Sequence, residues 1–81
     1  MRLPRDLSGS DLAFALQRLG YTASRQTGSH LRLTTQRNGE HHLTIPLHGA
    51  MRVGTLAAIL ADVANHCGLT RDEISDLIFG N

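Results

Sequence analysis

The chain has 81 residues and a formal net charge of +1 when histidine is neutral. This length accommodates one small domain, and the near-neutral charge excludes a polybasic tail. The single cysteine excludes an internal disulfide framework, and no apolar stretch reaches the roughly 18 residues that a membrane span needs. The N-terminus lacks a hydrophobic secretory core, so we expect a cytoplasmic protein with no membrane association.

Residues 11–19 predict the first helix. Ser10 is expected to cap its N-terminus, with the carboxylate of Asp11 favourable in the first turn. Gly20 is expected to end the helix in the left-handed conformation. The apolar residues that define the buried face follow helical spacing: Leu12, Ala15, Leu16 and Leu19.

Three short strands are predicted next, at residues 21–26, 30–36 and 41–47. A two-residue turn at Asn38-Gly39 would set Leu33 opposite Thr44 and mix an apolar face with a polar one. A three-residue loop at 37–39 instead pairs Leu33 with Leu43, and we predict that register. The same reasoning predicts a first loop at 26–28, with Gly28 left-handed and Ala23 opposite Leu31.

This register separates two faces of the sheet. The face toward the helices carries Leu31, Leu33, Leu43 and Ile45. The other face is polar and uncovered, and carries His30, Arg32, Thr34, His42 and Thr44. His30 is expected opposite Pro46, so that His48 lies at the same end of the sheet as His30.

Residues 55–67 predict a long helix that Gly68 ends, after a loop at 48–54. Thr70 and Glu73 form a capping box for a last short helix at 71–79, which must pack on the domain or on a partner. The predicted inner face of the long helix consists of Leu56, Ile59, Leu60, Val63 and Cys67. The order predicts an α+β fold, a three-stranded antiparallel sheet with helices on one face.

Histidines are the main candidates for chemistry. His30 follows a flexible turn and points away from the core, and an imidazole that titrates at about pH 6.5 can act as acid or base. The alternative is that His30 is an ordinary exposed strand residue. His41 and His42 point to opposite faces, and a zinc site from His30, His42 and His48 lacks the usual ligand spacings, so we expect no metal.

Arginine supplies every basic side chain of this sequence. Its planar guanidinium can bond two phosphate oxygens at once. Four of these residues are predicted to cluster around the open sheet face and its loops, where they could contact phosphates: Arg25, Arg32, Arg37 and Arg52. The alternative is a set of solvated surface side chains, since this face has no aromatic residue for base stacking.

Four segments in order resemble the HicA toxin family, the small mRNA interferases of HicAB toxin–antitoxin systems. The first helix ends in Leu-Gly-Tyr, and Gly28-Ser29-His30 is similar to the Gly-Ser-His that opens the family's second strand. Residues 44–49, TIPLHG, resemble its Val-Pro-x-His segment. Residues 54–60 resemble its Gly-Thr-Leu helix start. The resemblance runs from Ser10 to about Leu69.

This resemblance implies a double-stranded-RNA-binding-like fold, α-β-β-β-α, with a core at about residues 8–69 and a helical extension at 70–81 within a single domain of residues 1–81. It implies an endoribonuclease that cleaves mRNA without a metal or other cofactor, with His30 as the catalytic residue and His48 as a second candidate. It implies a HicB-like antitoxin that blocks the site, in a hetero-oligomer with the toxin. Gly28 would shape the turn, and the expected RNA contacts are Ser29, Arg25, Arg32, Arg37 and Arg52.

Two features depart from the family. Ala57 and Ala58 stand where basic residues often follow Gly-Thr-Leu, so RNA affinity would be weaker or carried elsewhere. The tail from Thr70 is longer than in the shortest members and is a candidate contact for a homodimer or for the antitoxin. The alternative function is a non-catalytic module on the same fold that binds RNA or protein.

Overall fold

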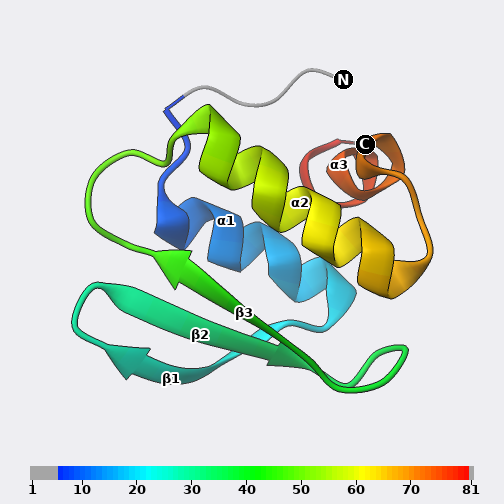
Figure 1. The fold of residues 1–81 in the computed structure, drawn as a ribbon, viewed down its shortest axis with the longest axis horizontal. Helices are drawn as coiled ribbons and strands as arrows, with labels where there is room; N and C mark the ends of the chain where they lie inside the picture. Colours follow the sequence, from blue (N-terminus) through cyan, green and yellow to red (C-terminus); the bar gives the residue numbers. More distant parts are fainter. Residues whose placement is uncertain (1–5, 81) are drawn as a thin grey trace.

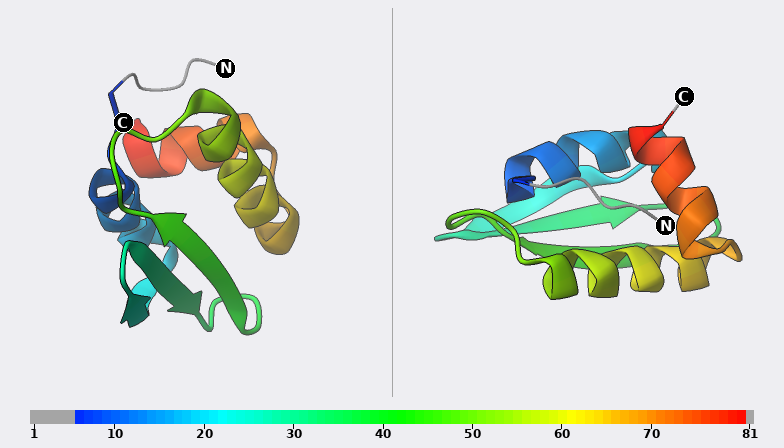
Figure 2. Two further views of the ribbon diagram at one scale, coloured as in Figure 1. Left: turned by 60° about the vertical axis from the view of Figure 1, so that its left-hand side comes forward. Right: turned by 90° about the horizontal axis from the view of Figure 1, so that it is seen from above.

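The computed structural model describes residues 6–80 and has the predicted α+β architecture (Figure 1). Three antiparallel strands form one sheet in the order β1-β2-β3, and all helices lie on the same side of it (Figure 2). The N-terminal segment 1–5 and Asn81, which belong to the expected domain of residues 1–81, lie outside the described residues. The elements are α1 (Gly9–Leu16), the 3₁₀ turn η1 (Gln17–Leu19), β1 (Thr22–Thr27), β2 (His30–Thr35), β3 (His41–Pro46), α2 (Val53–Cys67) and α3 (Arg71–Phe79).

Ser8 caps the first helix, so the prediction of Ser10 is wrong by two residues. The Ser8 hydroxyl accepts a hydrogen bond from the Asp11 backbone N–H at 3.0 Å, and the Asp11 carboxylate accepts one from the Ser8 N–H at 3.2 Å. This reciprocal capping box satisfies two backbone donors, the N–H groups of Ser8 and Asp11. Gly20 ends the helical segment with φ +84°, as predicted.

The β2–β3 hairpin has the predicted register. Leu33 lies opposite Leu43, and His30 lies opposite Pro46. Gly39 adopts φ +96° in the connecting loop, a left-handed value that glycine takes without steric cost. The open face and the helix-facing side of these two strands therefore carry the predicted residues.

The predicted β1–β2 register is wrong. Thr27 pairs with His30, so the loop is only Gly28-Ser29, and Ala23 lies opposite Leu33 rather than Leu31. The error begins at the turn, which is one residue shorter than predicted and lies further along the chain. A β-bulge between Ala23 and Arg25 then adds an extra residue and places Ala23 on the face of Leu33, which the alternation along one strand does not predict. Gly28 is left-handed as predicted, with φ +56°, which suits the first position of a two-residue hairpin turn.

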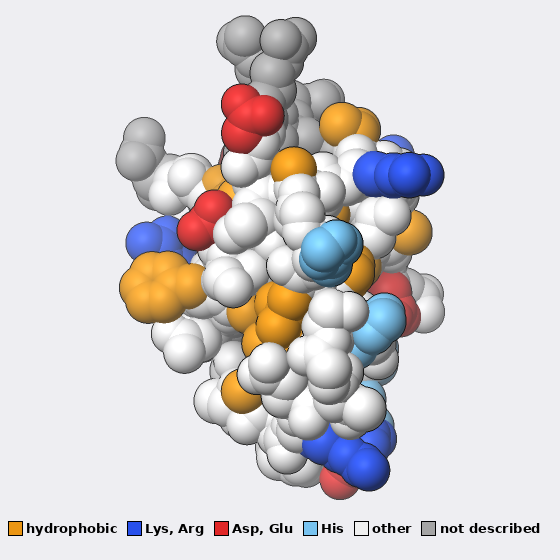
Figure 3. Space-filling view, turned by 90° about the vertical axis from the view of Figure 1, so that its left-hand side faces the viewer, with side chains coloured by type: hydrophobic (Ala, Val, Ile, Leu, Met, Phe, Trp, Pro, Cys, Tyr) orange, Lys and Arg blue, Asp and Glu red, His pale blue; other side chains and the backbone are white. Residues whose placement is uncertain are grey.

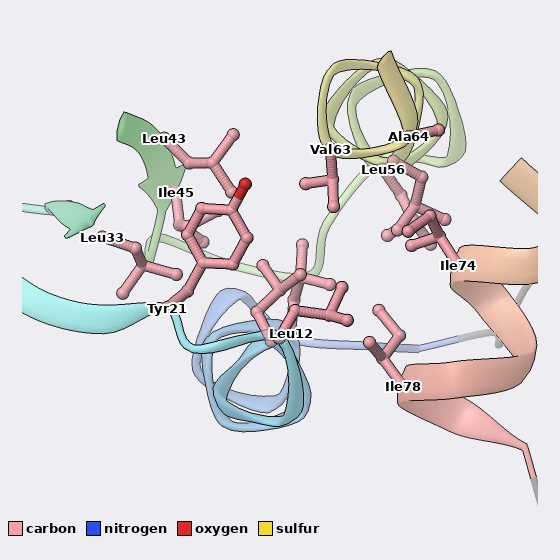
Figure 4. Close-up of a cluster of buried hydrophobic side chains, with 13 residues drawn as sticks. Leu12, Tyr21, Leu33, Leu43, Ile45, Leu56, Val63, Ala64, Ile74 and Ile78 are labelled. Carbon is pink, nitrogen blue, oxygen red and sulfur yellow. The ribbon is translucent and has the colours of Figure 1, made fainter. Parts of the chain in front are cut away.

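The core lies between the helix layer and one face of the sheet (Figure 4). Ala64 joins the buried face of α2, whereas Ile59 and Cys67, which were predicted to belong to it, are only partly buried at its margins. Ile74 and Ile78 of α3 are buried in the same core, so α3 packs on α2 and α1 of its own chain. The fully buried side chains are Leu12, Leu16, Leu33, Ile45, Leu56, Leu60, Val63, Ile74 and Tyr21.

The predicted capping box of α3 is confirmed by a hydrogen bond of 3.1 Å from the Glu73 N–H to the Thr70 hydroxyl and one of 2.9 Å from the Thr70 N–H to the Glu73 carboxylate.

Within residues 6–80, no single helix is long and apolar enough to cross a membrane. Only α2 and α3 taken together reach that length and composition, as a pair bent by 102°.

Candidate active site

His30 is the first residue of β2 and is exposed on the open face of the sheet. It is flanked by Thr27 of β1 and Pro46 of β3, and the next residue, Leu31, is partly buried on the opposite face. The turn before it is fixed to the end of β3, because the Leu47 N–H donates to the Ser29 carbonyl at 2.6 Å. In residues 6–80 the imidazole of His30 has no hydrogen-bond partner, so both ring nitrogens are accessible to a ligand.

His48 lies at the same end of the sheet, as predicted, in the loop after β3. It lines a hollow of about 300 Å³ together with Arg52, Pro46 and Thr55. Two contacts hold this loop against the start of α1: Ala50 pairs with Ser8, and the Met51 N–H donates to the Leu7 carbonyl at 3.0 Å. Figure 3 looks onto this end of the molecule and shows histidine side chains near the middle of the face, with basic side chains toward its margins.

Arg25 and Arg32 are direct cross-strand partners on the open face. The two-residue turn sets this pairing, because β1 and β2 stay in regular register from the Thr27–His30 pair to Arg25 and Arg32. Arg32 lies two residues from His30 along β2, a separation of roughly 7 Å at the usual rise of a strand. The structure thus brings two guanidinium groups to the same face as His30.

Arg37 does not belong to this group. It follows β2 at the opposite end of the sheet from His30, and its Nη1 donates to the Arg18 carbonyl at 3.3 Å. The four arginines therefore do not form the single cluster that the sequence predicted. Arg25 and Arg32 form a pair on the strands, Arg52 lies beside His48, and Arg37 is remote.

A hydrogen-bonded chain crosses the open face next to Arg32. The imidazole of His42 contacts the Glu40 carboxylate through Nε2 and the Thr34 hydroxyl through Nδ1, both at 2.8 Å. Thr34 contacts the Ser24 hydroxyl at 2.8 Å. The orientation of the His42 ring is consequently fixed on two sides, although the residue is exposed.

The pKa of Glu40 lies below its ordinary value. The main causes are its hydrogen bonds with His42 and with Gln36, and the charges of His42 and Arg32 act in the same direction. Glu40 therefore remains a carboxylate and orients the imidazole. The sequence did not single out this pair, although residues two apart in an extended segment share a face.

A second chain lies on the helix side of the sheet. The Tyr21 hydroxyl contacts Nδ1 of His41 at 2.7 Å, and Nε2 of His41 contacts Asp62 of α2 at 3.2 Å. His41 also stacks on His66, with ring centroids 4.3 Å apart. Burial, followed by the proximity of Cys67 and Asp62, raises the pKa of Tyr21, which keeps its hydroxyl protonated.

His66 and Cys67 have structural surroundings. Nε2 of His66 lies 2.9 Å from the Arg37 carbonyl and 3.1 Å from the Gly39 carbonyl, so the ring donates into the β2–β3 loop. Burial raises the pKa of the Cys67 thiol, which disfavours the nucleophilic thiolate. Among residues 6–80, no three His, Cys, Asp or Glu side chains are grouped so that they could hold a metal ion.

A comparison with models of protein families covers most of the chain. Residues 9–64, more than half of the chain, match the family model described as the HicA toxin of bacterial toxin–antitoxin systems. Neither a comparison with curated proteins nor one with solved structures returned a match. The matched segment runs from α1 into α2 and includes the sheet, His30 and His48. The chain therefore belongs to the HicA toxin family of bacterial toxin–antitoxin systems, in which a toxin is paired with an antitoxin.

Proposed function

We propose that this toxin is a metal-independent endoribonuclease that cleaves mRNA with His30 and is neutralised by a HicB-like antitoxin. The observation that carries the proposal is the position of His30: its imidazole is exposed and without a hydrogen-bond partner among residues 6–80, at the end of a rigid strand and on the same face as Arg25 and Arg32. This arrangement combines a group that transfers protons with groups that bind phosphate.

RNA carries its own nucleophile, the ribose 2′-hydroxyl. In the proposed reaction His30 accepts the proton of this hydroxyl, the 2′-oxygen attacks the adjacent phosphorus, and the bond from phosphorus to the 5′-oxygen breaks. The departing 5′-oxygen takes up a proton, for which His48 is the candidate donor. The products are a 2′,3′-cyclic phosphate and a 5′-hydroxyl, and no oxidant or co-reactant is consumed.

Arg32 is the candidate for stabilising the pentacoordinate phosphorus. Its guanidinium can donate hydrogen bonds to two phosphate oxygens. Such donors act most strongly on the negative charge that develops on these oxygens in the transition state. Arg25 beside it, Ser29 in the turn before His30, and Arg52 beside His48 are proposed contacts for the flanking backbone. DNA has no 2′-hydroxyl and is expected to be inert.

The antitoxin is proposed to cover the end of the molecule where His30 and His48 are exposed. Arg52 lines the hollow of His48, and Arg25 and Arg32 share the face of His30, so an acidic antitoxin surface would complement these arginines and exclude RNA. A toxin that is blocked in this way needs no change of its own fold.

The test compares His30→Ala and His30→Gln with the wild type, by growth arrest on expression and by cleavage of single-stranded RNA in the presence of a chelator. General acid–base catalysis contributes typically 10²–10⁴-fold, so both variants should lose about that factor in kcat. Retained RNA binding shows that the fold is intact. Full cleavage by His30→Gln would show that another group is catalytic, whereas RNA binding without cleavage by the wild type would favour the non-catalytic module. His48→Ala separates the two histidines, since unchanged cleavage would make His48 structural.

A further inference from the structure

A groove of about 490 Å³ runs along the outer edge of β3, between this strand and the first turns of α2. It is open because α2 presents small residues there. A Cβ added to Gly54 would meet nothing within 4 Å, and Ala58 is exposed one turn further along. The lining residues also include Leu43 and Ile59 as apolar walls and His42, Thr44, Thr55 and Asp62 as polar ones.

The groove continues into the hollow of His48 and Arg52, because Thr55 lines both. Pro46, which lies opposite His30, is part of the same hollow. Thr44 is two residues from Pro46 along β3, roughly 7 Å away at the usual rise of a strand. A ligand that reaches His30 with one unit can therefore place a neighbouring unit in the groove.

We propose that this groove binds one base of the RNA substrate next to the cleaved bond, and that Asp62 selects a base with an exocyclic amino group. The inference rests on the proposed ribonuclease function and adds its substrate preference. Sequence-specific recognition of RNA usually targets unstacked bases, which stack on aromatic or histidine rings and hydrogen-bond through their edges. His42 offers such a ring, and Glu40 and Thr34 already hold it in place.

Asp62 determines which base edge is favoured. Its Oδ1 accepts a hydrogen bond from His41 at 3.2 Å, yet the side chain is 54% exposed and lines the groove. A carboxylate only accepts hydrogen bonds, so it favours the amino groups of guanine, adenine and cytosine. Uracil presents carbonyl oxygens at those positions, which a carboxylate repels.

The experiment measures kcat/KM for short single-stranded RNAs that are identical except for the base on either side of the cleaved bond. The wild type should prefer an amino-bearing base over uracil by roughly tenfold at one of these positions. Asp62→Asn should reduce that preference to about twofold or less, because an amide can also donate to a carbonyl oxygen. Tyr21→Phe is the control, since it breaks the Tyr21–His41–Asp62 chain at its other end and leaves the carboxylate in the groove.

Filling the groove gives a second, independent readout. Ala58→Gln should raise KM for RNA severalfold with little change in kcat, whereas Ala61→Gln, on the same helix but outside the groove, should change neither. Thermal unfolding verifies that both variants are folded.

The outcomes separate this inference from the function on which it rests. An active Asp62→Asn enzyme with unchanged base preference, or a normal KM for Ala58→Gln, overturns the base site alone. Weaker antitoxin binding by Ala58→Gln with an unchanged KM for RNA would assign the groove to a polypeptide and also overturn it. A wild-type protein that cleaves no RNA overturns both proposals.

Discussion

Replacement of Ile74 by alanine is expected to destabilise this protein far more than replacement of Leu77 on the same short helix. Ile74 is fully buried, whereas Leu77 is 49% exposed. Figure 4 shows Ile74 directed toward Leu56 and Ala64 of α2. The comparison therefore tests whether α3 is an integral part of the core or a segment whose apolar side chains are reserved for a partner.

The magnitude follows from burial. Truncation of a buried isoleucine to alanine costs about 2–5 kcal/mol through lost burial and the cavity that remains. A chain of 81 residues has a free energy of unfolding of roughly 4–12 kcal/mol, so the loss is a large share of the total. At about 4–8 °C per kcal/mol for a domain of this size, even the lower limit shifts Tm by roughly 8–16 °C. Leu77→Ala should stay within about 0.5 kcal/mol.

Thermal and urea unfolding followed by far-UV circular dichroism, with the isolated toxin at several concentrations, measure both values. Equal effects of the two substitutions, or a larger effect at Leu77, would refute the packing of α3 on α2. A Tm of the wild type that rises with protein concentration would show that self-association contributes to stability.

Two further predictions concern the hydrogen-bonded chains. Tyr21→Phe should lower the free energy of unfolding by about 1–3 kcal/mol, because it leaves the ring nitrogen of His41 without its partner at a partly buried site. Chemical denaturation measures this loss. No change in stability would show that water replaces the hydroxyl. The lowered pKa of Glu40 means that its contribution to stability is complete above its ordinary value of 4.5 and is lost as the pH falls through the lower pKa of the folded state. The difference in Tm between the wild type and Glu40→Gln should therefore shrink below pH 4.5, and a difference that grows in acid would contradict this assignment.

Local sequence signals predicted the type of every helix and strand and the β2–β3 register. They succeeded where one physical requirement was dominant, as in the pairing of Leu33 with Leu43, which keeps two leucines on the buried face. They failed where two local solutions were nearly equivalent. Ser8 and Ser10 are both good caps, and only the carboxylate of Asp11 three residues after Ser8 distinguishes them.

The candidate site shows the same division. The sequence alone predicted that His30 follows a left-handed glycine, shares a face with Arg32 and lies at the same end of the sheet as His48. Only the tertiary structure placed Arg25 beside Arg32, removed Arg37 from the group, and linked His42 to Glu40 and Thr34. The packing of distant segments determines the bulge, the path of the loop, and the groove between a strand edge and a helix. The alternation of side chains along one strand carries no information about that packing.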